Sequence, residues 1–132
     1  MLAAMELFTP DNPDLKDYLS KTDGLLVVCY CAAWCDTCTQ YRPKIEGLAH
    51  SRSEHVFVWV DIEDDPDLLD DEDVENFPTI LIERDGEALF FGTMLPHINQ
   101  LERLVDALQS ESDISFDGSA PQDVRSLLLT SH

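Results

Sequence analysis

Basic residues are scarce in this 132-residue sequence, which contains 8 Lys and Arg against 27 Asp and Glu and has a formal net charge of −19 at pH 7. Proteins that hold nucleic acid neutralise its phosphates with Lys and Arg side chains, so the composition excludes this class of partner. The same excess of negative charge disfavours attachment to anionic membranes. We therefore expect no nucleic-acid partner and no membrane partner.

Long apolar runs are also lacking, because no stretch approaches the roughly 20 residues that cross a bilayer. The first ten residues contain no basic segment and reach Glu6 and Pro10 early, which is unlike a secretory signal. The expectation is therefore a cytoplasmic protein. In such a reducing compartment, clustered cysteines are typically catalytic or metal-binding, and stable structural disulfides are rare.

Cysteine is the residue type that is distributed most unevenly. Cys29, Cys31, Cys35 and Cys38 all lie within ten residues, whereas a disulfide-stabilised fold would spread them along the chain. With 44% hydrophobic and 27% charged residues, the composition is otherwise that of an ordinary globular protein. Any chemistry is therefore expected to start at these four thiols.

The spacing of apolar residues predicts one α/β domain over residues 1–109 and a polar C-terminal tail over 110–132. An unbroken apolar run is typical of a strand buried on both faces, and apolar residues three and four apart indicate helices. In the tail, residues 121–129 fit either a short helix or a frayed end. The expected order is β-α-β-α-β-α-β-β-α, with helices on both faces of the sheet. The segments assigned are helix 14–23, strand 25–31, helix 35–50, strand 56–61, helix 66–75, a hairpin of strands 78–83 and 87–91, and helix 96–109.

The pair Cys35-Asp-Thr-Cys38 follows the apolar run 25–31 and opens a helix, which is the context in which Cys-x-x-Cys indicates a redox site. The unpaired N–H groups and the positive dipole of a helix start stabilise a thiolate at Cys35, and the thiolate is the attacking species. Cys38 lies one turn further on nearly the same helix face. It can therefore attack the sulfur of Cys35 and resolve a mixed disulfide.

At these residues the sequence resembles the thioredoxin family. The resemblance extends over about residues 6–109, and it implies a thioredoxin-like α/β fold with a central mixed sheet of about five strands. It also implies thiol–disulfide exchange without an organic cofactor. The residues that carry it are Trp34-Cys-Asp-Thr-Cys38, Pro43 in the following helix, Phe77-Pro78-Thr79 before the hairpin, and Gly92 after the last strand.

The resemblance further implies that Pro78 is a cis proline that faces the cysteine pair, and that the backbone at Phe77 binds an extended substrate. Trp34 and Thr79 complete the expected substrate-binding residues, with Trp34 packed beside the pair. A cis X-Pro bond has only a modest energetic cost. From the sequence alone, a plain proline at the edge of a strand is the default for Pro78.

The dipeptide between the cysteines departs from the family pattern, because Asp36 and Thr37 stand where thioredoxins usually carry Gly-Pro. A carboxylate beside Cys35 is expected to disfavour its thiolate. This favours the disulfide and makes the reduced protein a better reductant. The alternative is that Asp36 is a surface acid that suits the first turn of a helix.

Cys29 and Cys31 are the other two departures. Cys29 occupies the position of a buried family acid that helps to deprotonate the resolving cysteine. Because a buried neutral thiol is a poor base, we expect slower resolution or a proton path through water. Cys31 replaces a bulky aromatic residue. Both side chains point to the same side of their strand, so they can form a second disulfide with the site cysteines or store an oxidation event. The alternative is that both are small buried apolar residues.

A metal site is the competing interpretation of the four cysteines. The spacing Cys-x-Cys-x3-Cys-x2-Cys can in principle supply four thiolates to zinc or to an iron–sulfur cluster. Two ligands on a strand and two on the next helix converge awkwardly, so no metal and no other cofactor is expected. The histidines at 50, 55, 97 and 132 show no ligand spacing, and His97 is expected at the surface.

Acidic residues gather between Asp61 and Glu75, where ten of fifteen residues are Asp or Glu. The simplest interpretation is a solvated face that keeps the protein soluble. The family resemblance places this segment beside the cis proline, at the rim of the substrate groove. There it would attract basic or neutral partners and repel acidic ones.

Together these features predict a thiol–disulfide oxidoreductase that acts as a reductant, with Cys35 as the nucleophile and Cys38 as the resolving thiol. Its expected partners are a disulfide-containing protein or peptide and a reductase or small dithiol that supplies electrons. The alternative function is a thioredoxin-fold adaptor that binds a partner with little catalysis. An adaptor, however, has no need to keep both thiols.

Overall fold

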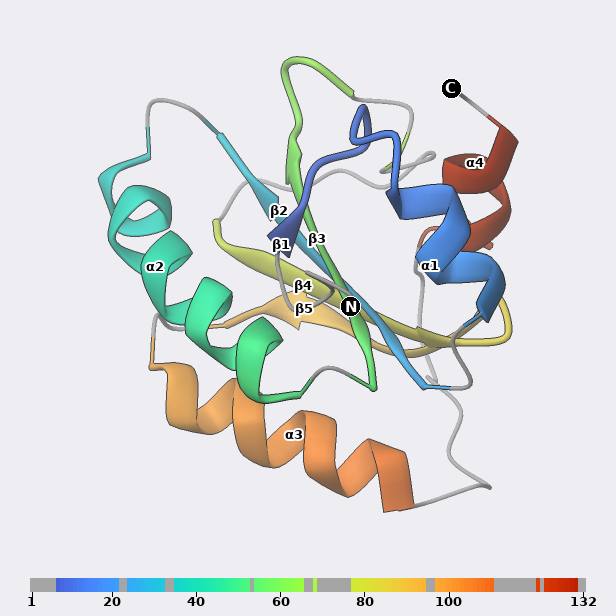
Figure 1. Ribbon diagram of the computed structural model, residues 1–132. Helices are drawn as coiled ribbons and strands as arrows, with labels where there is room; N and C mark the ends of the chain where they lie inside the picture. Colours follow the sequence, from blue (N-terminus) through green and yellow to red (C-terminus); the bar gives the residue numbers. More distant parts are fainter. Residues whose placement is uncertain are drawn as a thin grey trace.

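A mixed sheet between two layers of helices forms the protein (Figure 1), in a computed structural model that describes residues 7–21, 24–32, 35–52, 54–65, 68, 77–94, 97–110, 121 and 123–130. The strands follow the order β1-β3-β2-β4-β5. Strand β3 runs parallel to β1 and β2, and β4 runs antiparallel to β2 and β5, so the predicted mixed sheet of five strands is confirmed. The elements are β1 (Leu7–Phe8), α1 (Leu15–Lys21), β2 (Leu26–Cys31), α2 (Asp36–Ser51), β3 (Val56–Asp61), β4 (Thr79–Arg84), β5 (Glu87–Thr93), α3 (Ile98–Ser110) and α4 (Val124–Thr130).

The central strand β2 contributes side chains to two hydrophobic cores, one on each face of the sheet. All six of its residues are buried. Because side chains alternate along a strand, Val27 and Cys29 point to one face, where they pack with α2 and α3. Val28 and Tyr30 point to the other face, where they pack with α1 and α4. Burial on both faces is the reason that this strand appears in the sequence as an unbroken apolar run.

The hairpin between β4 and β5 turns at Asp85 and Gly86, which have φ values of 53° and 86°. Positive φ at both central residues is the mark of a type I′ turn, whose twist matches that of the two strands. Gly tolerates this conformation without cost, and Asp is among the few other residues that adopt it readily. The hairpin predicted from the Asp-Gly pair is therefore confirmed.

The start of β2 is fixed by the chain that precedes β3. The Leu25 N–H donates a 2.9 Å hydrogen bond to Nδ1 of the buried His55. Because Nδ1 accepts this bond, the proton of the neutral imidazole is assigned to Nε2. Burial lowers the pKa of His55. Gly24 passes so close that a Cβ there would collide with the backbone carbonyl of Glu54.

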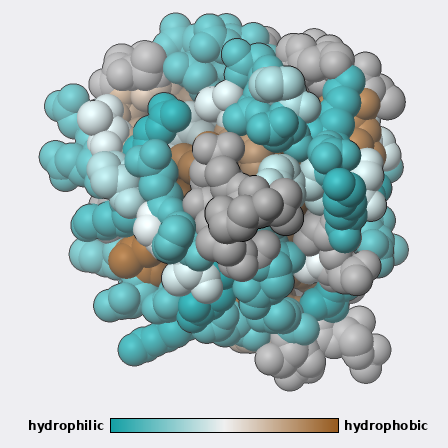
Figure 2. Space-filling view, in the orientation of Figure 1, coloured by the Kyte–Doolittle hydropathy of each residue, from teal (hydrophilic) through white to brown (hydrophobic). Residues whose placement is uncertain are grey.

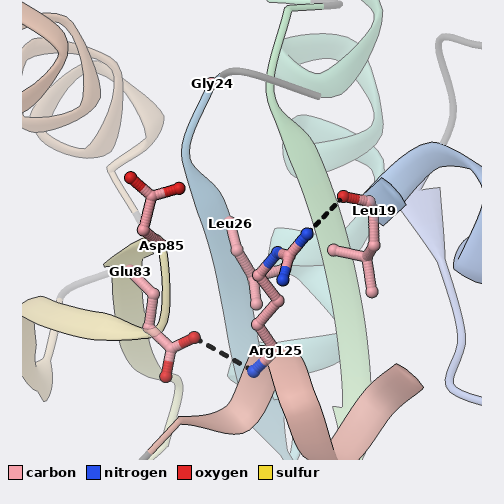
Figure 3. Close-up of a pocket in the computed structure, with 6 residues that line it drawn as sticks. All are labelled: Leu19, Gly24, Leu26, Glu83, Asp85 and Arg125. Carbon is pink, nitrogen blue, oxygen red and sulfur yellow. Dashed lines mark hydrogen bonds between the residues drawn. The ribbon is translucent and has the colours of Figure 1, made fainter. Parts of the chain in front are cut away.

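The C-terminal helix α4 is attached to the α1 side of the sheet through a buried carboxylate (Figure 3). Glu83 is 1% exposed and accepts hydrogen bonds from the N–H groups of Val124 at 2.8 Å and Arg125 at 3.1 Å. The Arg125 guanidinium donates to the Leu19 carbonyl at 3.0 Å. Burial raises the pKa of Glu83, and the two N–H groups oppose that shift. The free N–H groups at the start of α4 thus find a partner on another element.

Most predicted elements lie where the sequence places them. Strand β3 has the predicted bounds, and β2, α2, β4, β5 and α3 differ from theirs by at most two residues. Of the two alternatives for 121–129, the structure contains the helix, over Val124–Thr130. The helix predicted over 66–75 lies almost entirely outside the described residues. Among the helices that are described, none combines the length and the hydropathy needed to cross a membrane.

Candidate redox site

The four cysteines lie where the central strand ends and α2 begins. Within the sheet, Cys31 pairs with Asp61 of β3, and Tyr30 pairs with Thr79 of β4. The carboxyl end of β2 is therefore flanked by its neighbours on both sides. A short connection through Ala32 then leads the chain into α2.

Cys35 is the N-cap residue of α2, and it is half-buried. Its N–H donates a 3.0 Å hydrogen bond to the Ala32 carbonyl, which closes the turn between strand and helix. The Cys35 side chain makes no capping hydrogen bond. The first turn of a helix presents N–H groups and the positive end of the helix dipole to the residue that caps it. Cys35 therefore combines contact with solvent and a helix start, as the sequence predicts.

Cys38 lies one turn further along α2 and is 1% exposed. Its hydrogen bond with Cys31 and its burial raise the pKa of Cys38, whereas Cys35 and the Ala32 backbone lower it. The Cys38 thiol is therefore shielded from solvent and held in the protonated form. It interacts on one side with Cys35 and on the other with Cys31.

Cys29 and Cys31 lie beneath the pair, in the core between β2 and α2. Their sulfur atoms are 3.6 Å apart, and each residue is 1% exposed. The hydrogen bond with Cys29 raises the pKa of Cys31, the hydrogen bond with Cys38 lowers it, and burial raises it further. The prediction that both side chains point to one side of the strand is confirmed. Cys31 thus interacts with both Cys29 and Cys38, Cys38 also interacts with Cys35, and all four thiols are free.

Tyr41 also lies near the thiols, although it belongs to no site motif of the sequence. It is fully buried, and its hydroxyl has no hydrogen-bond partner among the described residues. Burial raises the pKa of Tyr41, and the charge of Cys29 and Cys31 adds to this effect. The sequence signal for Tyr41 is its place on the apolar stripe of α2, which does not reveal where its hydroxyl lies.

The Phe77–Pro78 peptide bond is cis, as the family resemblance implies. Pro78 is buried and immediately precedes Thr79, the first residue of β4, which pairs with Tyr30 at the cysteine end of β2. Phe77 packs against the same core cluster as Cys35. Pro78 thus stands just before the first residue of β4, a central strand that lies between β2 and β5.

The remaining predicted site residues fall into two groups. Asp36 is exposed in the first turn of α2, and Thr37 is half-buried beside it. Trp34 lies outside the described residues, so its expected place beside the pair stays a prediction.

The acidic segment is described only in its first part. Asp61 pairs with Cys31 in the sheet, and Glu63 and Asp64 follow as exposed residues. The acids from Asp67 to Glu75 lie outside the described residues. In the view of Figure 2 the described surface is mainly hydrophilic, and hydrophobic residues show in small, separate areas. The described acids of this segment thus follow the strand end next to Cys31.

The described part of the chain contains no group of three or more His, Cys, Asp or Glu side chains that could hold a metal ion. His97 is exposed, as expected, and His55 uses its Nδ1 atom to bind the backbone of Leu25. The geometry of the cysteines instead suits exchange of electrons between thiols, because one half-buried sulfur leads to a series of buried ones.

Comparison with known proteins identifies the same family that the sequence resembles. A family model described as Thioredoxin matches residues 6–109. Thioredoxin Asp f 28 of Aspergillus fumigatus is 25% identical over 100 residues, which cover 76% of this chain and 92% of the relative. The fold is similar to that of a mutant thioredoxin from Halobacterium salinarum, with a TM-score of 0.68, 22% identity, and coverage of 85% of this chain and 98% of the other. A chain from the crystal structure of the complex between ferredoxin:thioredoxin reductase and thioredoxin f2 has a TM-score of 0.68 and 19% identity, with coverage of 83% and 100%.

Proposed function

Since this chain belongs to the thioredoxin family and is a thiol–disulfide oxidoreductase, we propose that Cys35 attacks the disulfide of a protein or peptide substrate and that Cys38 resolves the product. The observation that carries this assignment is the contrast in burial between the two thiols. Cys35 is half-buried at a helix start, whereas Cys38 is 1% exposed directly behind it. A substrate can therefore reach Cys35 and not Cys38.

The reaction proceeds in two exchange steps. The Cys35 thiolate attacks one substrate sulfur, so that a mixed disulfide forms and the other substrate sulfur leaves as a thiolate. Cys38 then loses its proton and attacks the Cys35 sulfur, which releases the second substrate thiol and leaves a Cys35–Cys38 disulfide. Because burial and the bond to Cys31 keep Cys38 protonated, the second step needs a proton acceptor. Cys29, in the position of the family acid, is a poor one.

The substrate chain is proposed to lie along the backbone at Phe77 and Pro78. The cis bond between them and the pairing of the adjacent Thr79 with Tyr30 support this position, because both keep the segment next to the cysteine end of β2. An extended chain can bind there by hydrogen bonds from its backbone. Trp34 is assigned to the same surface by its place next to Cys35 in the sequence.

We also propose that the protein acts as a reductant in the cytoplasm and receives its electrons from a reductase or a small dithiol. Four free thiols suit a reducing compartment. The exposed Asp36 beside Cys35 favours the disulfide form of the pair and hence electron donation. A reductase as partner is supported by the neighbour in fold that was crystallised in a complex with ferredoxin:thioredoxin reductase. The net charge of −19 and the exposed acids near Cys31 favour basic or neutral substrates.

Reduction of insulin disulfides tests the assignment of the two cysteines. The reduced wild type is expected to cleave insulin, and Cys35→Ser to abolish cleavage. Cys38→Ser is expected to accumulate a covalent adduct between Cys35 and an insulin chain, which mass spectrometry detects. If the wild type does not turn over, the protein is an adaptor rather than a reductase, and an adduct on the Cys35→Ser chain would show that another thiol attacks first.

A further inference from the structure

Two thiols that the proposed exchange reaction does not use lie directly beneath the two that it does. The Sγ atoms of Cys29 and Cys31 are 3.6 Å apart, and Cys31 shares its core cluster with Cys38. A disulfide also needs its two Cβ atoms to lie about 3.5–4.5 Å apart, whereas parallel side chains two apart on a strand have Cβ atoms roughly 6.6 Å apart. A Cys29–Cys31 bond therefore requires the chain to bend at Cys31, the last residue of β2, as well as the two sulfur atoms to approach each other.

We propose that Cys29 and Cys31 form a second, internal dithiol that takes over the disulfide made at Cys35 and Cys38, so that one reduced chain cleaves two substrate disulfides. This inference rests on the proposed function, because the first disulfide must arise by exchange with a substrate. It adds a site, Cys29 and Cys31, that holds the first disulfide while Cys35 and Cys38 return to their reduced state.

The transfer requires two internal exchange steps. Cys31 loses its proton and attacks the Cys38 sulfur, so that the Cys31–Cys38 bond forms, the Cys35–Cys38 bond breaks, and Cys35 leaves as a thiolate. Cys29 loses its proton and attacks the Cys31 sulfur, which forms the Cys29–Cys31 bond and releases Cys38 as a thiolate. Each leaving thiolate can take up the proton that the attacking thiol loses, and no electrons leave the chain.

A second substrate disulfide then reacts at Cys35 and Cys38 as the first one did. Over both turns, four thiols become two disulfides, and two substrate disulfides become two dithiols. The four electrons and four protons lost by the chain are those gained by the substrates. No oxidant other than the substrate disulfide is needed.

Burial determines the route and the speed of this transfer. Cys29 and Cys31 are each 1% exposed, so a substrate disulfide cannot reach them directly, and Cys31 receives its oxidation through Cys38. The hydrogen bond with Cys29 raises the pKa of Cys31, and burial acts in the same direction. The internal steps are therefore slower than the attack by Cys35, and they accelerate as the pH rises.

The Tyr41 hydroxyl supports a charged intermediate at this place. It is buried and has no hydrogen-bond partner among the described residues, and it lies near enough to Cys29 and Cys31 for their charge to affect its pKa. A thiolate that forms on either sulfur during the transfer gives this donor an acceptor. A purely apolar core would offer the intermediate no such group.

The number of insulin disulfides cleaved per chain tests the proposal. The fully reduced protein, freed of reductant, is mixed with excess insulin and stopped with acid at successive times. Free thiols are then alkylated in denaturant and counted by mass spectrometry. The wild type is expected to cleave two disulfides per chain in a fast and a slow phase and to end with no alkylated cysteine. The Cys29→Ala/Cys31→Ala double variant is expected to cleave one, in the fast phase alone.

Two single variants form a matched pair, because each removes one buried sulfur atom from the same side of β2. With Cys29→Ala, the disulfide can pass to Cys31–Cys38 and free Cys35, which then attacks a second insulin molecule and stays bound as a mixed disulfide. With Cys31→Ala no transfer is possible, so one disulfide is cleaved and no such adduct accumulates. A folding defect would affect both variants alike and does not produce this difference.

Two results would overturn the inference. One is a wild type that cleaves a single disulfide per chain and retains alkylated Cys29 and Cys31. The other is equal adduct formation by the Cys29→Ala and Cys31→Ala chains. Failure of the proposed function gives a different result, because neither the wild type nor the double variant then cleaves insulin.

Discussion

Asp36 is the charged residue closest in sequence to Cys35, the proposed nucleophile, and its effect belongs to the scale of single residues. It is exposed in the first turn of α2, one position after Cys35. A carboxylate there competes with the thiolate for the same N–H groups and the same dipole. Its exposure means that solvent weakens the competition, so the effect on the thiol is modest.

Asp36→Asn is expected to increase the rate of Cys35 alkylation near neutral pH by about two- to fivefold, as a charge effect of about 0.3–1 kcal/mol at a helix start implies. It also makes the reduced protein a weaker reductant, because a stabilised thiolate favours the dithiol. Alkylation kinetics and equilibration with glutathione measure the two effects. Asp17→Asn is the control, since Asp17 is an exposed acid in the first turn of α1 and is expected to change neither. An unchanged alkylation rate in Asp36→Asn would mean that Asp36 acts only as a surface acid.

At this scale the sequence is sufficient to assign Cys35 and Cys38 as a candidate redox pair. It is insufficient to show how Cys29 and Cys31 interact with that pair. The Cys-x-x-Cys spacing is a local pattern, so Cys35 and Cys38 can be assigned before any packing is known. The alternation of a strand places Cys29 and Cys31 on one face. Their interaction with Cys38 depends on how α2 packs over β2, which the sequence does not state. The orphan hydroxyl of Tyr41 depends on the same packing.

At the scale of elements, the attachment of α4 depends on one acid in a distant strand. Glu83 accepts hydrogen bonds from two N–H groups at the start of a helix 41 residues further along the chain. The side chains of Val124 and Leu128 are buried in the core on that face. Helix α4 lies beyond the residues that the thioredoxin family model matches, so its attachment is a feature of this chain.

Glu83→Ala is expected to lower the free energy of unfolding by about 1–3 kcal/mol, because the two N–H groups lose their acceptor. The amides of Val124 and Arg125 are expected to exchange with solvent about tenfold faster or more, while amides of β2 keep their protection. Urea unfolding and hydrogen exchange measure the two effects. Glu87→Ala is the matched control, since Glu87 is an exposed acid on the neighbouring strand. Retained protection of the Val124 and Arg125 amides in the Glu83 variant would show that apolar packing alone holds α4.

The elements that the sequence predicts well are those with local signals. Strand β3 and the hairpin follow from apolar runs and from the Asp85-Gly86 turn, whose residue types suit its positive φ angles. The attachment of α4 has no local signal. Acids are seldom buried, so an acid at the end of an apolar strand is expected to face solvent. Glu83 is instead buried, because its partners come from the far end of the chain.

At the scale of the whole molecule, charge is expected to influence which partners approach. The chain has a formal charge of −19, and the exposed acids Glu63 and Asp64 lie close in sequence to the strand end that pairs with Cys31. A concentrated negative region speeds the approach of positive partners at low ionic strength. Salt weakens this effect, because the screening length falls to about 3 Å at 1 M.

A cationic disulfide peptide is therefore expected to be reduced about tenfold faster than an anionic one of equal length at low salt, and the two rates to converge at high salt. Stopped-flow kinetics over a range of NaCl concentrations measure this. Glu63→Gln/Asp64→Asn should reduce the preference more than Asp85→Asn/Glu87→Gln, which removes two exposed acids from the hairpin turn. Equal loss of preference in both double variants would assign the effect to net charge, and equal rates for the two peptides would exclude steering altogether.

The position of α4 provides a point for attaching the molecule to a label or a surface. Its anchor Glu83 pairs with Leu26 at the beginning of β2, whereas Thr79, beside the cis proline, pairs with Tyr30 near the end of that strand. Four residues of strand separate the two positions, or roughly 13 Å along the sheet. A dye, a resin or an electrode surface joined to the exposed side of α4 is therefore set apart from the path of an incoming disulfide. An immobilised form of the protein can thus be built without covering Cys35, the proposed nucleophile.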